Sequence, residues 1–290
     1  METGSVCERG RLGWEFATIY WRDMIRFFRF RALLFSSLVQ PALWMAFFGV
    51  AMSANFDKLL SNIPIPPGAV RVEYLTFMGA GVIAMTTLFT SLFGGISLLF
   101  DKNWGLMREM LASPMPRNHI VAGIGLSGVT KSFIQVGVIM AFGVAIGVRF
   151  FQGYGALEVV TAVLGMLAFV TFFSLSFLFL SATISMRLTS PEGVQGVITL
   201  LTMPIFFASN ALYPVDAFPE VLKVMSRVNP LTHFINGLRY FAIGHDFYAI
   251  GTHYVYRPGD VLFSFGVLVV FAGLTFALAW WTFRKAVITG

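Results

Sequence analysis

Charged residues are scarce in this sequence of 290 residues. Only 12% are Asp, Glu, Lys or Arg, while 57% are hydrophobic, and soluble domains are typically about a quarter charged. The single cysteine, Cys7, excludes an internal disulfide. Residues 1–31 lack the apolar run and the small-residue cleavage site of a signal peptide, so we expect none here. The composition therefore predicts an integral membrane protein.

Acidic residues are missing from the middle of the long apolar runs. The acids nearest to them, Glu73, Asp101, Glu158 and Glu192, all stand at their edges. Ion-coupled carriers and proton pumps normally need ionisable groups within the membrane, so this absence argues against both classes. Lys131 is the one strongly basic residue well inside a run. We expect its side chain to extend to the inner headgroups, with a substrate contact as the alternative.

Groupings typical of catalysis or metal binding are also missing. No two of the four histidines have helical metal-ligand spacing with a supporting carboxylate. Residues 125–132 resemble a phosphate-binding loop only superficially, because Thr130 occupies the position of its second glycine. No cluster of aspartates suits a lipid-processing enzyme. We expect no catalytic residue, metal or cofactor in this chain, and nothing predicts a nucleic-acid partner.

Six long apolar runs are present. Each has about 20 residues or more, which is enough to cross about 30 Å of hydrocarbon. Continuous runs of this length predict helices rather than the short alternating strands of a barrel. The sequence therefore predicts an all-α integral membrane protein with six transmembrane helices. They are expected at Ala32–Met52, Tyr74–Phe100, His119–Val148, Leu157–Met186, Gly193–Leu212 and Val261–Phe283.

The distribution of basic residues predicts the orientation. With both termini in the cytoplasm, the cytoplasmic side has thirteen basic residues against seven acidic ones, and the outer side has seven of each. Such an excess of Lys and Arg marks the cytoplasmic side of membrane proteins. We expect a multi-pass protein of the cytoplasmic (inner) membrane.

Residues 1–31 form a cytoplasmic N-terminus that precedes the transmembrane domain, 32–290. A polar, mostly basic stripe recurs there at helical spacing and predicts an amphipathic helix lying in anionic headgroups. This helix could be an orientation anchor, or it could frame the mouth of a path or touch a partner. The stripe consists of Arg11, Glu15, Thr18, Arg22, Arg26 and Arg29.

The segment 213–260 is too polar and too rich in proline to span a membrane. It contains two short helical patterns, Phe218–Arg227 and Thr232–Ile243, separated by Asn229 and Pro230. Neither is long enough to cross, so a re-entrant or surface-lying helical hairpin is expected. The hairpin could cap an exit path or be an ordinary folded outer loop.

A short polar segment, 101–117, separates the second and third runs. It predicts an amphipathic helix of one or two turns that ends at Pro114 and Pro116. No other part of the chain suits mechanical coupling to a soluble partner. The alternative is an ordinary interfacial loop.

Three parts of the sequence carry a resemblance to a known family. They are the segment 101–117, the segment 209–239 with its Asn229–Pro230 pair, and the N-terminal amphipathic pattern before six runs. The chain resembles the membrane subunit of type-2 ATP-binding-cassette (ABC) exporters, which include drug, lipochitooligosaccharide and polysaccharide permeases. Two positions depart from the pattern: Asn103 stands where many relatives have Glu, and Asn210 where Gly is common.

The resemblance implies a permease that works as a pair, as a homodimer, with a separate ABC ATPase subunit bound beneath each copy. ATP and Mg belong to that partner, which pushes the helix in 101–117 and opens a path outward. Leu106, Met110 and Leu111 are expected to face the membrane part, leaving Arg108 and Glu109 for the ATPase. The full set of expected coupling residues is Trp104, Gly105, Leu106, Arg108, Glu109, Leu111, Ser113, Pro114 and Arg117.

The same resemblance implies that the first, second and fifth spans line the path. The candidate residues are Trp44, Phe47, Phe48, Phe77, Met85, Thr86, Thr202 and Phe206, with Pro214, Asn229 and Pro230 at an outer gate. An aromatic wall without charges suits an amphipathic or lipid-linked cargo, although such stripes also serve helix packing. The alternatives are a polysaccharide or glycolipid exporter, and a non-transporting scaffold that docks a cytoplasmic partner.

Overall fold

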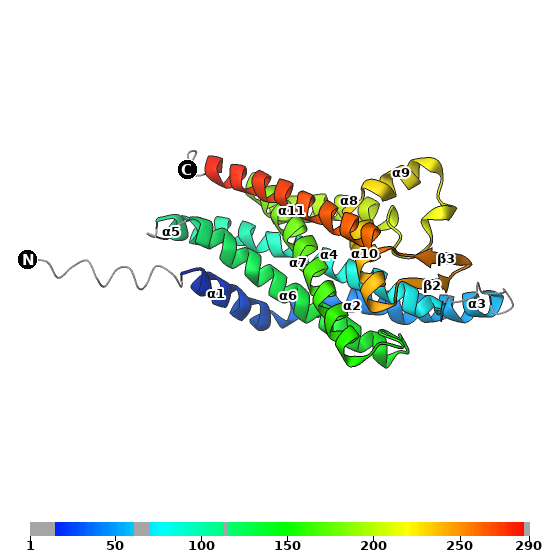
Figure 1. Ribbon diagram of the computed structural model, residues 1–290. Coiled ribbons are helices and arrows are strands. Elements are labelled where there is room, and N and C mark those ends of the chain that lie inside the picture. The colour runs from blue at the N-terminus through cyan, green and yellow to red at the C-terminus, as the bar shows by residue number, and fades with distance from the viewer. Residues whose placement is uncertain (1–14, 61–69, 113–114, 116, 287–290) are drawn as a thin grey trace, which may run out of the picture.

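The computed structural model describes residues 15–60, 70–112, 115 and 117–286, which form an elongated helical bundle (Figure 1). One end carries α1, α5 and the last turns of α11, and is called the α5 end. The opposite end carries α3 and the β2–β3 hairpin, and is called the hairpin end. The helices of the bundle are α4 (Tyr74–Asn103), α6 (Arg117–Ala145), α7 (Ala156–Arg187), α8 (Pro191–Phe207) and α11 (Pro258–Ala286).

Five helical segments in the described residues are long and apolar enough to cross a membrane: Ser37–Leu59, Tyr74–Asn103, His119–Ala145, Ala156–Arg187 and Pro258–Lys285. They correspond to five of the six predicted runs. The remaining run corresponds to α8, which has 17 residues and is shorter than the roughly 20 residues of a typical span. Among the described residues, five of the six predicted runs are therefore helices of membrane-spanning length and composition, and the sixth span stays a prediction.

The first span is irregular in its middle. It consists of α2 (Arg31–Leu43), a π-helical segment (Trp44–Gly49) and α3 (Val50–Leu60). Pro41 lies inside α2, three residues before the π-helical segment begins. A helix-interior proline removes a backbone hydrogen bond, and π segments are rare and occur mostly as single turns within α-helices.

Helix α4 forms the centre of the bundle. In an apolar 18-residue stretch of α4, 72% of the residues are buried, whereas the corresponding share in the first span is 17%. Close helix contacts depend on small residues, because a side chain at Gly95 would collide with Ser181 of α7. Aromatic stacking also packs α7 against α10, where the ring centres of Phe173 and Phe234 lie 4.2 Å apart.

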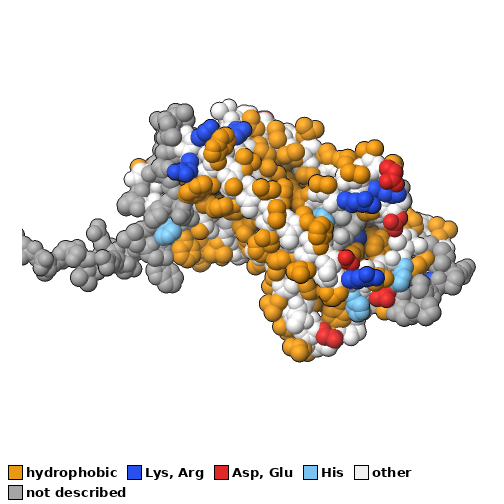
Figure 2. Space-filling view, turned by 45° about the horizontal axis from the view of Figure 1, so that its top comes forward, with side chains coloured by type: hydrophobic (Ala, Val, Ile, Leu, Met, Phe, Trp, Pro, Cys, Tyr) orange, Lys and Arg blue, Asp and Glu red, His pale blue; other side chains and the backbone are white. Residues whose placement is uncertain are grey.

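The outer segment contains the two predicted helices, as α9 (Glu220–Val228) and α10 (Pro230–Ala242). Helix α10 is buried against α4, α7 and α11, with Leu231, Phe234 and Leu238 fully inaccessible. Whether this segment re-enters a membrane stays a prediction. On the face shown in Figure 2, hydrophobic side chains cover the middle of the molecule, basic side chains lie toward the α5 end, and charged side chains of both signs gather at the hairpin end.

The chain after α10 forms short strands, which the sequence did not predict, within a fold that is otherwise helical as expected. Strands β2 (Asp246–Ala249) and β3 (Thr252–Val255) form an antiparallel hairpin, and β1 (Val70–Arg71) pairs with β2 in parallel. Ile250 and Gly251 have φ values of 50° and 74°, and two-residue hairpin turns require such positive values. Phe247 and Ala249 alternate inward, so the hairpin buries one face.

Candidate functional site

Helix α1 (Glu15–Arg29) lies along the α5 end of the bundle (Figure 1). Within its polar stripe, Arg22 and Arg26 are half-buried, whereas Thr18 and Arg29 are exposed. Its outward face is apolar: Trp21 is 66% exposed and Phe28 is 55% exposed. Asp23 and Met24, on the opposite face, are buried. The helix is amphipathic, as predicted, but its polar face contacts other helices.

Two arginines of α1 bind the same carboxylate near the end of α4. Arg22 Nη2 donates to Asp101 Oδ2 over 2.9 Å, and Arg26 Nη2 donates to Asp101 Oδ1 over 2.6 Å. Asp101 is only 2% exposed, so its charge depends on these partners. Arg22 and Arg26 thus bind a carboxylate of the same chain, which periodicity alone does not indicate, because it locates a polar stripe without identifying what covers it. We call these three residues the Asp101 clasp. Whether α1 lies in headgroups stays a prediction.

A second buried ion pair joins α1 to α6. Lys131 Nζ lies 2.5 Å from Asp23 Oδ2, and Ser127 donates to the same oxygen. Burial raises the pKa of Asp23, but the Lys131 charge and these hydrogen bonds lower it by more, leaving it below its ordinary value. Lys131 therefore pairs with Asp23 inside the protein, and the prediction that it extends to the headgroups was wrong.

Helix α5 (Leu106–Ala112) follows α4 after a sharp turn at Gly105. Gly105 has φ of +80°, a conformation that glycine adopts without the strain imposed by a side chain. Met107 is buried among Ile19 of α1, Leu98 of α4 and Ile120 of α6. Apolar contacts therefore fix α5 to the same helices that the ion pairs join.

The predicted coupling residues differ in their exposure to solvent. Trp104 is 63% exposed, Glu109 is exposed, and Leu106 is half-buried. Met110 packs against the buried cluster that contains Met107, and its sulfur accepts a hydrogen bond from Arg22 Nη1 over 3.4 Å. The positions that lie outside the described side chains are Arg108, Leu111, Ser113, Pro114 and Arg117.

Met107, the most buried of the described side chains of α5, was missed by the sequence reasoning. It lies three residues before Met110, so helical spacing places both on one face. Their i, i+3 relation was the available signal.

The turn after α8 is held by side chains from distant helices. Asn229 Nδ2 donates to Ile205 O over 2.6 Å, and Tyr74 Oη donates to Leu212 O over 3.2 Å. These donors satisfy carbonyls at and beyond a helix C-terminus, where intrahelical partners are missing. Gly81 permits the approach, because a Cβ there would lie 2.3 Å from the Ala211 carbonyl oxygen.

Arg239 of α10 completes this outer turn. Its Nη2 donates to Asn210 O over 2.7 Å, and its guanidinium lies 3.6 Å from the centre of the Phe77 ring. The residue is fully inaccessible, and it is in none of the ion pairs found among the described residues. Backbone carbonyls and an aromatic face take the place of a carboxylate.

The three predicted gate residues lie around this turn. Asn229 caps α10, accepting from the Leu231 N–H over 3.0 Å, and Pro230 is the first residue of that helix. Pro214 precedes the short 3-10 helix Val215–Ala217. The structure brings all three close to the end of α8, and their role as a gate stays a prediction.

Residues 15–242, which include α1, α5 and the outer turn with Arg239, match the family described as "ABC-2 type transporter". The chain belongs to the ABC-2 type transporter family. Among its relatives is the transport permease ycf38 of Cyanophora paradoxa, 31% identical over 208 residues. The matched part is 70% of this ABC-2 type chain and 65% of that relative, less than two thirds of its length.

Two further relatives of this ABC-2 type chain have names that refer to a process. The daunorubicin resistance ABC transporter permease protein DrrB1 of Streptomyces coeruleorubidus is 26% identical over 216 residues, covering 74% of this chain and 70% of the relative. Nodulation protein J of Rhizobium leguminosarum bv. trifolii is 26% identical over 168 residues, covering 57% and 60%.

The predicted path residues of this ABC-2 type chain fall into two groups. Those in the first span face outward: Phe47 is 73% exposed, Phe48 is 36% exposed, and Trp44 is half-buried. Those in α4 and α8 pack between helices of the same chain. This second group consists of Phe77, Met85, Thr86, Thr202 and Phe206, none more than 5% exposed. Which of them line a path stays a prediction.

Proposed function

We propose that this chain is the membrane permease subunit of an ATP-driven exporter, worked by a separate ABC ATPase that binds at the α5 end. The α5 end is then cytoplasmic, as the distribution of basic residues predicts. The observation that carries the proposal is the Asp101 clasp, which ties α1 and α4 together directly beside α5. ATP and Mg belong to the partner.

The clasp makes α1, α4 and α5 move together. A force on exposed Glu109 reaches α4 through the Gly105 turn, and a force on exposed Trp104 acts directly on the end of α4. The buried Met107 stops α5 from sliding freely. Breaking a buried ion pair by moving one partner alone costs several kcal/mol. A rigid-body displacement therefore requires less free energy than a local one.

Helix α4 carries the displacement to the opposite membrane face. Its 30 residues extend about 45 Å at the α-helical rise per residue. Its first residue, Tyr74, donates to Leu212 in the turn after α8. A push at Asp101 thus acts on the outer turn, which is the proposed gate.

A second copy of the chain completes the path in this proposal, with six spans in each copy and α8 as the fifth. The first span supports pairing, because its apolar window is only 17% buried within one chain. We propose an amphipathic or lipid-linked cargo. The relatives named for daunorubicin resistance and nodulation support this class, while a polysaccharide or glycolipid cargo is the alternative.

Co-purification with the partner ATPase tests the proposal. Glu109→Lys is expected to reduce ATPase recovery and cargo-stimulated ATP hydrolysis at least tenfold, because an exposed charge at the contact is reversed. The matched control is Glu220→Lys, an exposed acid in α9 at the far end of the molecule. Equal loss in both variants, or no loss in Glu109→Lys, contradicts the coupling role. Full ATPase binding without ATP-driven cargo uptake in vesicles identifies a scaffold instead.

A further inference from the structure

The last turn of α4 also contacts the connection between α7 and α8. Lys102 Nζ donates to Met186 O over 3.0 Å and to Leu188 O over 3.3 Å. Asn103 Nδ2 donates to Thr189 O over 3.3 Å, but Asn103 is exposed, so water competes for this bond. Lys102 is half-buried, and hydrogen bonds from a charged donor are roughly twice as strong as neutral ones. Lys102 therefore makes the stronger contact, which we call the Lys102 contact.

The Lys102 contact falls where α7 ends. Helix α7 ends at Arg187, and the last carbonyl groups of a helix have no intrahelical donors. A cation near a helix C-terminus also interacts favourably with the helix dipole. Because consecutive residues of a helix point about 100° apart, Asp101 binds α1 while Lys102 binds the α7–α8 connection. The end of α4 thus holds two separate neighbours.

The connection is short and leads directly into α8. Residues 188–190 alone separate the two helices. Ser190 Oγ accepts from the Gly193 N–H over 3.1 Å, and Pro191 is the first residue of α8. A serine N-cap followed by proline is a favourable start for a helix. A displacement of the connection therefore moves the first turn of α8 with it.

Helix α8 buries a single face, which packs against α4. Leu200 and Met203, on the opposite face, are 73% and 51% exposed. The buried face is apolar except for Thr202, whose hydroxyl donates to Ile198 O within the helix. Because apolar contacts are non-directional, this face does not by itself determine how far α8 follows a displaced α4. The buried face consists of Val194, Ile198, Thr202 and Phe206.

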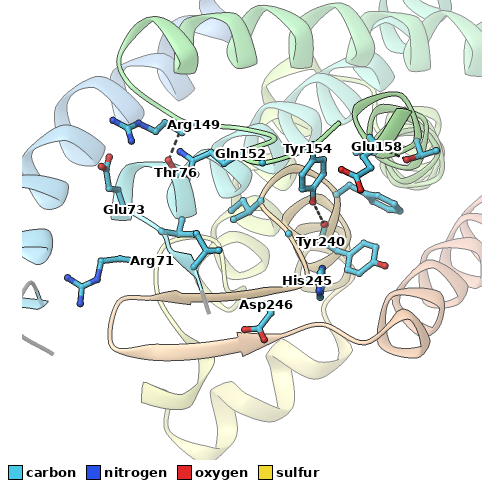
Figure 3. Close-up of a pocket in the computed structure, with 18 residues that line it drawn as sticks. Arg71, Glu73, Thr76, Arg149, Gln152, Tyr154, Glu158, Tyr240, His245 and Asp246 are labelled. Atoms are coloured by element: carbon cyan, nitrogen blue, oxygen red, sulfur yellow. Dashed lines mark hydrogen bonds between the residues drawn. The ribbon is translucent and has the colours of Figure 1, made fainter. Parts of the chain in front are cut away.

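The start of α4, in contrast, is bound by polar contacts to the loop before α7 (Figure 3). The Arg149 N–H of that loop donates to Thr76 Oγ1 of α4 over 3.1 Å. Tyr154 Oη, at the other end of the loop, donates to Tyr240 O of α10 over 3.4 Å. Helices α4 and α7 are therefore joined near both membrane faces, and α8 is the neighbour that depends on the Lys102 contact.

We propose that Lys102 is a positioning residue that makes the start of α8 follow the end of α4. A push on α5 then reaches the outer turn by two routes. One runs along α4 to Tyr74, and the other runs along α8 to Ile205, whose carbonyl binds Asn229. The role in transmission rests on the proposed function, whereas the Lys102 contact itself does not.

Hydrogen exchange measured by mass spectrometry on the full-length chain tests the contact without any partner. Lys102→Met removes the ammonium group and keeps most of the apolar stem. It is expected to speed exchange of the backbone N–H groups in residues 188–196 about fivefold, because charged hydrogen bonds that hold the connection are lost. Lys102→Arg retains a charged donor and should restore slow exchange. The matched control is Lys285→Met, which removes an exposed positive charge at the same end. Unchanged exchange in Lys102→Met overturns the proposal.

The role in transmission is tested in the complex with the partner ATPase. Adding AMP-PNP, a non-hydrolysable ATP analogue, is expected to change the exchange of residues 208–213 in the unaltered complex. In Lys102→Met this response should be mostly lost while ATPase recovery stays the same. A full response in Lys102→Met overturns the positioning role, and so does a loss of ATPase recovery, which would place Lys102 in the ATPase contact. An unaltered complex that does not respond contradicts the proposed function, while exchange in residues 188–196 still decides whether Lys102 holds the connection.

Discussion

The two ends of α4 stabilise a buried charge in opposite ways. At the α5 end a buried carboxylate, Asp101, has two guanidinium partners. At the other end a buried guanidinium, Arg239, has backbone carbonyls and the Phe77 ring. The ion pairs join α1 to α4 through charged side chains, whereas Arg239 joins α10 to the backbone of the outer turn. We infer that the α5 end is adapted to receive a push and the outer turn to be displaced together with α4.

The largest expected effect comes from removing the shared carboxylate. Asp101→Leu leaves the Arg22 and Arg26 charges half-buried without a partner, at a cost of about 3 kcal/mol after allowance for their partial exposure. The melting temperature in detergent should fall by several degrees. Asn103→Leu, two residues later and exposed, is the control. An unchanged melting temperature would show that the clasp contributes nothing to stability.

The Asp23–Lys131 pair should show the next largest effect. Lys131→Met leaves a buried unpaired carboxylate and is expected to cost about 2–3 kcal/mol. The double variant Asp23→Leu/Lys131→Met should recover most of that loss, because no isolated charge remains. Thermal unfolding of Asp23→Leu, of Lys131→Met and of the double variant measures the coupling free energy. Additive losses would contradict a direct pair.

The same pair predicts a direction for pH dependence. The pKa of Asp23 is lower in the folded chain than its ordinary value, so its contribution to stability is present above about pH 4. That contribution is lost as the pH falls through the lower folded-state pKa. Asp23→Asn should remove this part of the acid-induced destabilisation.

Arg239→Lys tests the opposite end and should cost about 2 kcal/mol. Lysine keeps the charge but lacks the planar fork that stacks on Phe77 and reaches the Asn210 carbonyl. Arg227→Lys, in exposed α9, is the matched control. If the two replacements lower the melting temperature equally, the special role of Arg239 is refuted.

Gly105→Ala should have the smallest effect on stability, about 1 kcal/mol, because its φ of +80° is unfavourable for alanine. The site has open space, so only the backbone conformation is tested. Gly137→Ala also meets open space, but it lies in helix α6, and it should be neutral or stabilising. Coupled ATP hydrolysis should fall only in the first variant. Normal hydrolysis there would argue against transmission of force through the Gly105 turn.

The sequence predicted the parts of this chain that depend on local pattern. Run length identified five spans, and proline and periodicity located α5, α9 and α10 within a few residues. Partners were not predictable in this way. Nothing local indicates that Arg22 meets Asp101 or that Lys131 meets Asp23, since these residues are brought together only by helix packing.

The β1–β2 pairing was not predicted from the sequence, for a related reason. Val70 pairs with Phe247, and such a distant partner leaves no signature in either segment. The hairpin itself carried a weak signal in Ile250 and Gly251, but its strands have only four residues each.

The π-helical segment Trp44–Gly49 divides the first span into two surfaces that do not align. One extra residue in a helix rotates everything after it by about 100°. A substitution scan along this span should therefore show one periodicity before Trp44 and a shifted one after Gly49. A neighbouring helix that packs against one face of α2 therefore meets a different face of α3. The first span thus presents two distinct surfaces to a partner chain.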